Sequence, residues 1–379
     1  MARFLLMTPG PTVVDPDVLL EMARPTMNHV SPEFDELHRE TLGLLGRVFG
    51  TGGRVILFPG SGTAAMELAV RSVVGPGDRV LVLRAGVFGD YLAEAARSVG
   101  ARVDVARVEP GKGFTASMLE EYLSGASYSA VLFQHVDTST SVANPVAELA
   151  RVARRHGARV VVDGVASIGG MEMRMDEWGV DVCFTGSQKA LSTPPGLAIV
   201  AFREGFEPRR DTSTLFFNVE KLLAEMESTR NYYLTPAVNL VYGLNRSLKR
   251  MIEGEGLGER YRRHRVMAEA VQAAVEALGL QLVAEKPFRA RTVTAVYLPR
   301  GIEWPRLYTE ARRRGVELAG GLGELKGRIF RIGHMGETTV NDIAATIAVL
   351  ERVLARLGYS VKLGKGLEAM QQVLDSHGY

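Results

Sequence analysis

ARVVVDGVAS (residues 158–167) and VDVCFTGSQKALSTPPG (residues 180–196) are two neighbouring apolar runs, and each leads into a charged residue. The charged residues are Asp163 in the first run and Lys189 in the second. Short apolar runs bounded by Gly and Pro are typical of buried strands in a parallel sheet. Groups just beyond the carboxyl ends of such strands face the ligand crevice. We therefore expect Asp163 and Lys189 to face one site.

A carboxylate and an amine at one edge of a sheet suit pyridoxal phosphate as a ligand. The aldehyde of this cofactor forms a Schiff base with a lysine, and its ring nitrogen pairs with an acid. A simple salt bridge between strand ends is the alternative, and it is common for any single Asp and Lys. Motifs elsewhere in the chain are needed to decide between a cofactor site and a salt bridge.

Strands alternate with helices between residues 54 and 203, which indicates an α/β fold. This alternation predicts a mostly parallel sheet of seven strands, built from right-handed crossovers and lying between helices. The expected strands are residues 54–60, 79–86, 101–109, 128–136, 158–165, 180–187 and 197–203.

The chain is expected to have three parts. Residues 1–14, which contain TPGPT, form an extended arm because Pro9 and Pro11 cannot start a helix. Residues 15–255 form the large ligand-binding domain. Residues 256–379 mix helices with short strands and form a smaller α+β domain. For the final stretch, residues 366–379, a docked amphipathic helix and a frayed tail are both open.

Composition excludes several classes of protein. The 45 basic residues nearly balance the 43 acidic ones, so no charge pattern for binding nucleic acid is present. No apolar run reaches the roughly 20 residues that a membrane span needs, and MARFLLMTPGPT is too short in its apolar part for a signal peptide. One cysteine, Cys183, forbids intrachain disulfides and fits the cytoplasm. No metal site is expected.

A glycine-rich loop at residues 60–63, GSGT, joins an expected strand to a helix. The first amides of that helix are free donors, and they suit a phosphate together with the hydroxyls of Ser61 and Thr63. Gly62 allows a close approach of the backbone. A tight turn with an N-cap would have the same sequence, so the loop alone does not identify a phosphate site.

Further candidates follow other expected strands. Phe88 lies between two glycines, where a ring could stack on a cofactor; Thr138 belongs to a hydroxyl-rich strand end; and Val165 falls on the same side as Asp163. Arg331, in RIFRIGH, carries a guanidinium fork that binds a carboxylate in bidentate fashion. Each of these is more often a core or surface residue when it occurs alone.

In this order, the motifs resemble those of the class V, fold-type I, pyridoxal-phosphate aminotransferases. The similarity is closest to the alanine–glyoxylate and serine–pyruvate branch, and it covers nearly the whole chain through TPGPT, DGVASIGG, GSQKAL, PPG and RIGHMGE. It implies a ping-pong transaminase that moves an amino group from alanine or serine to glyoxylate or pyruvate.

The resemblance implies a role for each candidate residue. Lys189 is the Schiff-base lysine, Asp163 is the partner of the pyridine nitrogen, and Arg331 takes the substrate carboxylate. Those that hold the cofactor's phosphate are Ser61, Gly62, Thr63 and Gln188, and those beside its ring are Phe88 and Thr138. Tyr232 and Thr235 reach the phosphate from a neighbouring subunit, which implies a homodimer with shared active sites.

The chain departs from the family pattern at three positions, and two other functions are open. Phe88 stands where Trp is frequent, Asp137 where Glu is usual and Ser141 where Gly is common. A 2-aminoethylphosphonate–pyruvate transaminase shares several motifs but needs an added basic cluster. A catalytically retired subunit would be expected to lack Lys189 or its acid. A desulfurase needs a mobile cysteine, which Cys183 in a strand does not provide.

Overall fold

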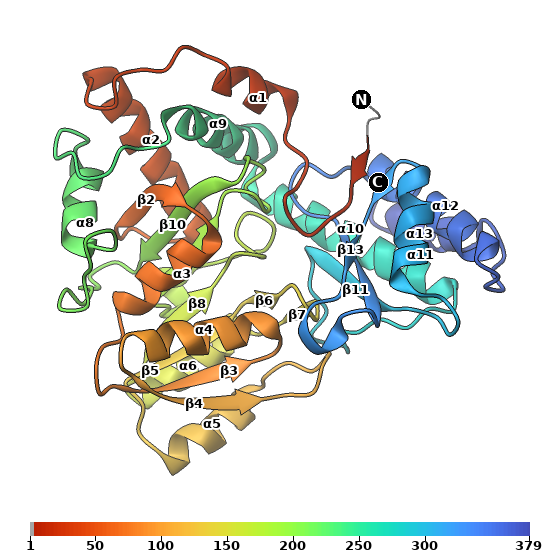
Figure 1. The fold of residues 1–379 in the computed structure, drawn as a ribbon, viewed down its shortest axis with the longest axis horizontal. Coiled ribbons are helices and arrows are strands. Elements are labelled where there is room, and N and C mark those ends of the chain that lie inside the picture. Colours follow the sequence, from red (N-terminus) through yellow and green to blue (C-terminus); the bar gives the residue numbers. More distant parts are fainter. Residues whose placement is uncertain (1–3) are drawn as a thin grey trace.

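The computed structural model describes residues 4–379. A seven-stranded sheet forms the centre of the α/β part, with helices on both sides (Figure 1). In spatial order its strands are β2 (Val55–Gly60), β10 (Gly196–Phe202), β9 (Val182–Gly186), β8 (Arg159–Asp163), β5 (Ala130–Gln134), β3 (Arg79–Arg84) and β4 (Arg102–Arg107). β10 runs antiparallel to β2 and β9, and the other four strand pairs are parallel, so the predicted mostly parallel sheet is confirmed.

The antiparallel direction of β10 follows from its short connection to β9. Residues 187–195 return the chain directly to the neighbouring position, whereas a parallel neighbour requires a crossover of a dozen or more residues. Lys189 lies in this return. The loop is therefore held at both ends by paired strands.

The helices of this part begin and end where local sequence signals place them. Ser31 caps α2 by accepting a hydrogen bond from the Phe34 amide, and Gly50 ends that helix at φ +65°. The helices are α1 (Pro16–Met22), α2 (Pro32–Phe49), α3 (Gly62–Arg71), α4 (Val87–Ser98), α5 (Ala116–Gly125), α6 (Val146–Arg155), α7 (Met175–Trp178), α8 (Val219–Glu227) and α9 (Val238–Lys249).

The C-terminal region is smaller and packs beside the α/β part (Figure 1). After α9 the chain forms a π-helical turn, η1 (Arg250–Glu255), and then passes Gly256, beside which we proposed the domain boundary. The region contains α10 (Leu257–Ala277), β11 (Val293–Tyr297), α11 (Trp304–Arg313), β12 (Val316–Glu317), β13 (Ala319–Gly320), η2 (Gly323–Leu325), β14 (Ile329–Gly333), α12 (Val340–Arg356) and α13 (Lys365–Ser376). Its sheet is antiparallel, in the order β11–β14–β13.

Both ends of the described chain join the C-terminal region. The arm contributes β1 (Leu5–Leu6), which pairs in parallel with β12. At the other end α13 is a docked helix, because Met370 and Leu374 are buried in the same cluster as residues of α10 and α12. A short β6 (Val136–Asp137) and β7 (Val142–Ala143) form a hairpin between β5 and α6.

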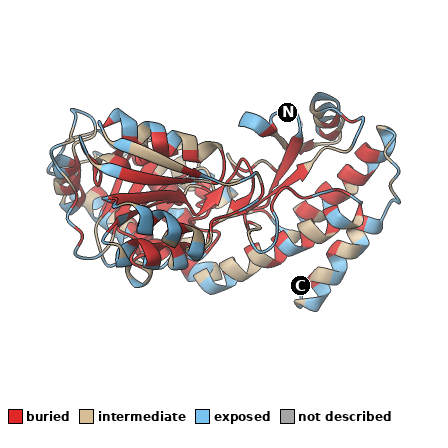
Figure 2. Ribbon diagram, turned by 90° about the horizontal axis from the view of Figure 1, so that it is seen from below, coloured by how far each residue is buried: buried red, intermediate tan, exposed pale blue. Residues whose placement is uncertain are grey.

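Buried residues line the sheets and the inner helix faces (Figure 2). One hydrophobic cluster surrounds the seven-stranded sheet, and a second fills the C-terminal region. Within residues 4–379, no helix combines the length and the apolar character that crossing a bilayer requires.

Arg260 of α10 connects the two parts of the molecule. Its guanidinium is almost fully buried and donates to the carbonyls of Gly169 and Ala190, both at 2.8 Å. It also pairs with Glu255 at 3.0 Å and with Glu337 at 3.1 Å. Because a buried cation must be fully paired, this side chain fixes how α10 sits against the loop that follows Lys189.

We expect Arg260→Ala to lower the free energy of unfolding by about 3–5 kcal/mol, because it removes a buried cation with two ion pairs and leaves the carbonyls of Gly169 and Ala190 without this donor. Arg174→Ala, which removes an exposed pair with Glu172 and Glu177, should cost about 1 kcal/mol or less. Urea unfolding of the two variants measures both values. Equal losses would contradict the assigned role of Arg260.

Candidate active site

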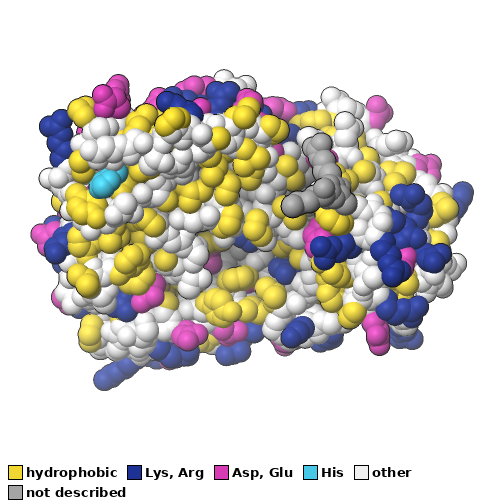
Figure 3. Space-filling view, turned by 45° about the horizontal axis from the view of Figure 1, so that its top comes forward, with side chains coloured by type: hydrophobic (Ala, Val, Ile, Leu, Met, Phe, Trp, Pro, Cys, Tyr) yellow, Lys and Arg dark blue, Asp and Glu magenta, His cyan; other side chains and the backbone are white. Residues whose placement is uncertain are grey.

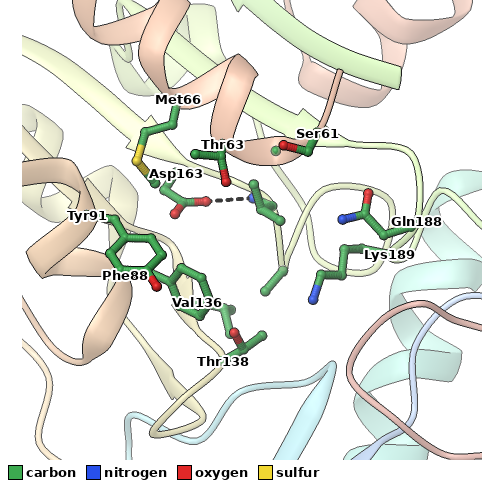
Figure 4. A pocket seen from close by; sticks show the side chains of 13 residues that line it. Ser61, Thr63, Met66, Phe88, Tyr91, Val136, Thr138, Asp163, Gln188 and Lys189 are labelled. Carbon is green, nitrogen blue, oxygen red and sulfur yellow. Dashed lines mark hydrogen bonds between the residues drawn. The ribbon is translucent and has the colours of Figure 1, made fainter. Parts of the chain in front are cut away.

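A cavity of about 220 Å³ opens at the carboxyl ends of the sheet strands. Figure 4 shows side chains from several elements converging on it. Nine of the sequence-predicted residues line it: Ser61, Gly62, Thr63, Phe88, Thr138, Asp163, Val165, Gln188 and Lys189. The structure therefore brings together residues that are up to 128 positions apart in the chain (189 − 61).

Asp163 ends β8 and is 3% exposed. One of its carboxylate oxygens accepts a hydrogen bond from the Val165 amide at 2.9 Å (Figure 4). Burial raises the pKa of Asp163 to about 7; nearby Asp137 adds to this rise, whereas the Val165 amide and Lys189 oppose it. Around neutral pH the group is therefore balanced between acid and carboxylate, which suits sharing a proton with a ring nitrogen.

Lys189 enters the cavity from the side opposite Asp163 (Figure 4). Burial lowers the pKa of its amine to about 8, and the charge of Arg331 lowers it further, against the attraction of Asp163. A neutral amine is therefore accessible near physiological pH, as a nucleophile or a proton carrier requires. The amine donates a hydrogen bond to the carbonyl of Pro9.

The N-terminus of α3 and Gln188 form a cradle for an anion. Ser61 precedes the helix in an extended conformation and makes no side-chain cap bond, which leaves its hydroxyl and the first helix amides available. The side-chain amide of Gln188 lines the cavity, and its NH2 group can donate to an anion there. At Gly186 an added Cβ would lie 3.2 Å from the Gly62 nitrogen, so the backbones approach closely here.

Asp137 holds the start of α4 and thereby Phe88. Its carboxylate accepts from the Phe88 amide at 3.1 Å and from the Ser139 hydroxyl at 2.5 Å. The Ser139 hydroxyl in turn accepts from the Val87 amide at 3.0 Å. Thr138, between these two anchors, lines the cavity. Asp137 is thus bonded to α4 directly through Phe88 and indirectly through Ser139.

Arg331 of β14 lies next to this wall. It is 7% exposed and donates to the carbonyls of Thr138 at 3.1 Å and Gly320 at 2.8 Å. Burial lowers its pKa to about 10, so it keeps its charge at neutral pH. It does not itself line the cavity, but it is bonded to the carbonyl of Thr138, which does.

Tyr232 and Thr235, like Arg331, are predicted residues that do not line this cavity. Tyr232 is 52% exposed, and its hydroxyl bonds with that of Thr235 at 2.8 Å. Its ring packs on His29, with 4.9 Å between the ring centroids. Within the described part of one chain, neither residue is among those that line the cavity.

Four lining residues were missed by the analysis of the sequence: Met66, Tyr91, Val136 and Ala166. Met66 lies one helical turn beyond Gly62 on α3, and Tyr91 lies one turn beyond Phe88 on α4. The spacing of helix neighbours could have identified both, because residues three or four apart share a face.

These residues fit pyridoxal phosphate. The free helix amides and the NH2 group of Gln188 are donors that suit its phosphate, and the buried Asp163 suits its ring nitrogen. Lys189 supplies an amine with a lowered pKa on the opposite side of the cavity. The salt-bridge interpretation is less apt, because no ion pair between Asp163 and Lys189 is found among the described residues.

The raised pKa of Asp163 predicts a pH-dependent stability of the cofactor-free protein. Between pH 4 and 7 the unfolded chain releases the Asp163 proton while the folded chain keeps it, so stability falls as pH rises through this window. Asp163→Asn removes this loss. The free energy of unfolding of this variant, relative to that of the wild type, should therefore increase from pH 4 to pH 7 by at most about 4 kcal/mol.

Urea unfolding at pH 4, 5.5 and 8 measures this difference. Asp375→Asn on the exposed side of α13 is the control and should show no such change with pH. A gain for Asp163→Asn that is the same at all three values would contradict the assigned environment.

Comparison with known proteins identifies the family. Residues 21–324 match the model of the class V aminotransferases. The chain is 37% identical over 375 residues to the L-aspartate–glyoxylate aminotransferase of Paracoccus denitrificans, covering 96% of this chain and 94% of that protein. It is 34% identical over 386 residues to the serine–glyoxylate aminotransferase of Arabidopsis thaliana, with coverages of 99% and 96%.

A solved structure leads to the same family. The alanine–glyoxylate aminotransferase of Nostoc sp. superposes with a TM-score of 0.89 at 32% identity, covering 93% of this chain and 96% of that one. The resemblance inferred from the motifs is confirmed, and with it the enzyme class and the cofactor pyridoxal phosphate. The chain belongs to the class V aminotransferases.

Proposed function

We propose that this enzyme transfers the amino group of a small monocarboxylic amino acid, alanine or serine, to glyoxylate, with pyruvate as the second acceptor. The observation that carries the proposal is a cavity lined by the buried Lys189 amine, with the Arg331 guanidinium bonded to the carbonyl of Thr138 in its wall. The names of the three relatives also support it, because their donors differ while glyoxylate is common to all of them.

The cofactor would be held by residues from five elements. Ser61, Gly62, Thr63 and Gln188 are proposed to bind its phosphate, and Phe88, Thr138 and Val165 to surround its ring. Asp163 would pair with the ring nitrogen. When bound, pyridoxal phosphate supplies an aldehyde that accepts the amino group and a ring that withdraws electrons from the substrate Cα.

The protein residues then have distinct tasks. Arg331 binds the carboxylate of the amino donor, and this fixes the direction of the Cα–H bond. With the cofactor bound, the free amine of Lys189 would take the proton from the substrate Cα and carry it within the cavity. Its lowered pKa allows the amine to accept and release that proton near neutral pH.

The lining of the cavity favours small donors with a single carboxylate. Met66, Phe88, Tyr91 and Val136 make much of its wall apolar, and among residues 4–379 no arginine or histidine lines it. A second carboxylate, as in aspartate, would lose its hydration without gaining a cation. The same argument disfavours 2-aminoethylphosphonate, whose dianionic group needs more positive charge.

We also propose a homodimer in which the partner completes each site. Hydrophobic side chains gather on the side of the molecule that carries α1 and α9 (Figure 3), and large exposed apolar patches are typical of interfaces. Leu20 of α1 is 70% exposed and Leu215 is 86% exposed. Tyr232 and Thr235 carry the two exposed hydroxyls that would reach the phosphate of the partner.

A catalytically retired subunit is the weaker alternative, because Lys189 and Asp163 are both present and both have shifted pKa values. We propose the cytoplasm as the compartment. The lone Cys183 is buried, and a chain without disulfides suits a reducing environment.

The donor can be tested by adding single amino acids to the purified enzyme without any acceptor. Alanine or serine should shift the visible absorption of the bound cofactor to shorter wavelength, whereas aspartate and 2-aminoethylphosphonate should do so at least tenfold more slowly at equal concentration, roughly the effect of one lost charge interaction. Lys189→Ala is the control and should give no turnover while remaining folded. A faster response to 2-aminoethylphosphonate would contradict the proposed substrate class.

Shared sites can be tested by mixing two impaired variants. Lys189→Ala lacks the amine, and a double variant, Tyr232→Phe with Thr235→Val, lacks the two hydroxyls. In a hybrid dimer one site regains both features, so the mixture should be more active than either variant alone at low cofactor concentration. Exchange of subunits is checked by native mass spectrometry. Hybrid dimers without any gain in activity would contradict the sharing.

A further inference from the structure

The TPGPT segment, Thr8–Thr12, has no role in the function proposed above, although it passes between the two parts of the molecule (Figure 1). Just before it, Met7 is bonded on both sides to the C-terminal region. The Met7 amide donates to Glu317 at 2.9 Å, and its carbonyl accepts from the Gly333 amide at 2.7 Å. Gly333 is the last residue of β14, the strand that carries Arg331. The segment thus starts from a fixed point near the proposed carboxylate binder.

The other end of the segment is bonded to the loop that carries Lys189. The Thr12 amide donates to the carbonyl of Gln188 at 3.1 Å, and the Thr12 hydroxyl donates to the carbonyl of Lys189 at 2.8 Å. Thr12 is 5% exposed, so water does not readily replace these bonds. The backbone of the lysine is therefore held by the arm.

The middle of the segment covers the lysine side chain. Gly10 has φ +121°, and a Cβ added to it would lie 2.5 Å from Cδ and 2.6 Å from Nζ of Lys189. Only glycine fits this position, for reasons of both conformation and space. The next group along the arm, the Pro9 carbonyl, accepts the hydrogen bond of the lysine amine.

We propose that Thr12 is a positioning residue for Lys189, and that the segment Pro9–Thr12 sets where the lysine amine stands relative to Arg331. The arm contacts the lysine at its backbone, along its side chain and at its amine. The inference rests on the proposed role of Lys189 as the carrier of the Cα proton.

The placement matters because proton transfer is sensitive to small displacements. Arg331 sets the direction of the Cα–H bond, and the amine must meet that bond in line. A shift of about 1 Å can cost on the order of a hundredfold in rate. The arm is bonded both to the strand that carries Arg331 and to the loop that carries Lys189. It therefore fixes the position of one group relative to the other.

The test removes the Thr12 hydroxyl with little change of shape. In the full-length enzyme with cofactor, Thr12→Val should lower kcat with alanine by roughly tenfold, with little change in KM. It should also raise the kinetic isotope effect measured with alanine deuterated at Cα, because proton transfer becomes slower relative to the other steps. Thr12→Ser keeps the hydroxyl and should restore both values. Gly10→Ala should lose more activity than Thr12→Val.

Thr346 provides a matched control. It is also buried, and its hydroxyl donates to a backbone carbonyl, that of Asp342 at 2.7 Å, within α12. Thr346→Val should leave kcat and the isotope effect unchanged. Thermal unfolding of every variant shows whether the fold is kept.

The outcomes separate this inference from the proposed function. If Thr12→Val has the kcat and isotope effect of the wild type while Lys189→Ala is inactive, the positioning role is wrong and the function stands. A lower melting temperature with an unchanged isotope effect would also overturn it, since the arm would then only stabilise the fold. Turnover by Lys189→Ala would instead overturn the proposed function itself.

Discussion

The arrangement of this molecule depends on keeping a lysine amine out of water. Lys189 lies on a short return between two strands, and burial there lowers the pKa of its amine to about 8. A loop in such a place has backbone carbonyls that also need partners. The carbonyls of three successive residues, beginning with Lys189, accept hydrogen bonds from three different elements. The donors are Thr12 of the arm, Arg260 of α10 and Ser247 of α9. The contacts that join the two parts of the molecule therefore also hold the backbone at the lysine.

Much of the fold could be predicted from the sequence because its signals are local. Short apolar runs bounded by Gly and Pro indicated the seven strands. The split of residues 316–321 into β12 and β13 was not foreseen. It depends on pairing with two different partners, β1 and β14, that are distant in the sequence. Local pattern carries no information about such partners.

The site was predictable where residues follow strands, and less so elsewhere. Asp163, Lys189 and the loop at residues 60–63 all lie at carboxyl ends of sheet strands, which topology alone brings to one edge. The contribution of Pro9 could not be predicted, because it is a backbone carbonyl that any residue supplies. The environment of Arg331 could not be predicted from the sequence either. Its partners are the carbonyls of Thr138 and Gly320, so no side chain in the sequence identifies it.

The departure from the family at position 137 becomes understandable in this geometry. The Asp137 carboxylate lies close to the start of α4, since an added Cβ at Gly86 would stand 2.3 Å from it. Ser139 completes the reach by bridging Asp137 and the Val87 amide. Because Thr138 lies between these anchors and its carbonyl accepts from Arg331, the same three residues link Phe88, the proposed ring platform, to Arg331, the proposed carboxylate binder. Asp137 and Ser139 together therefore hold the start of α4 at the edge of the cavity.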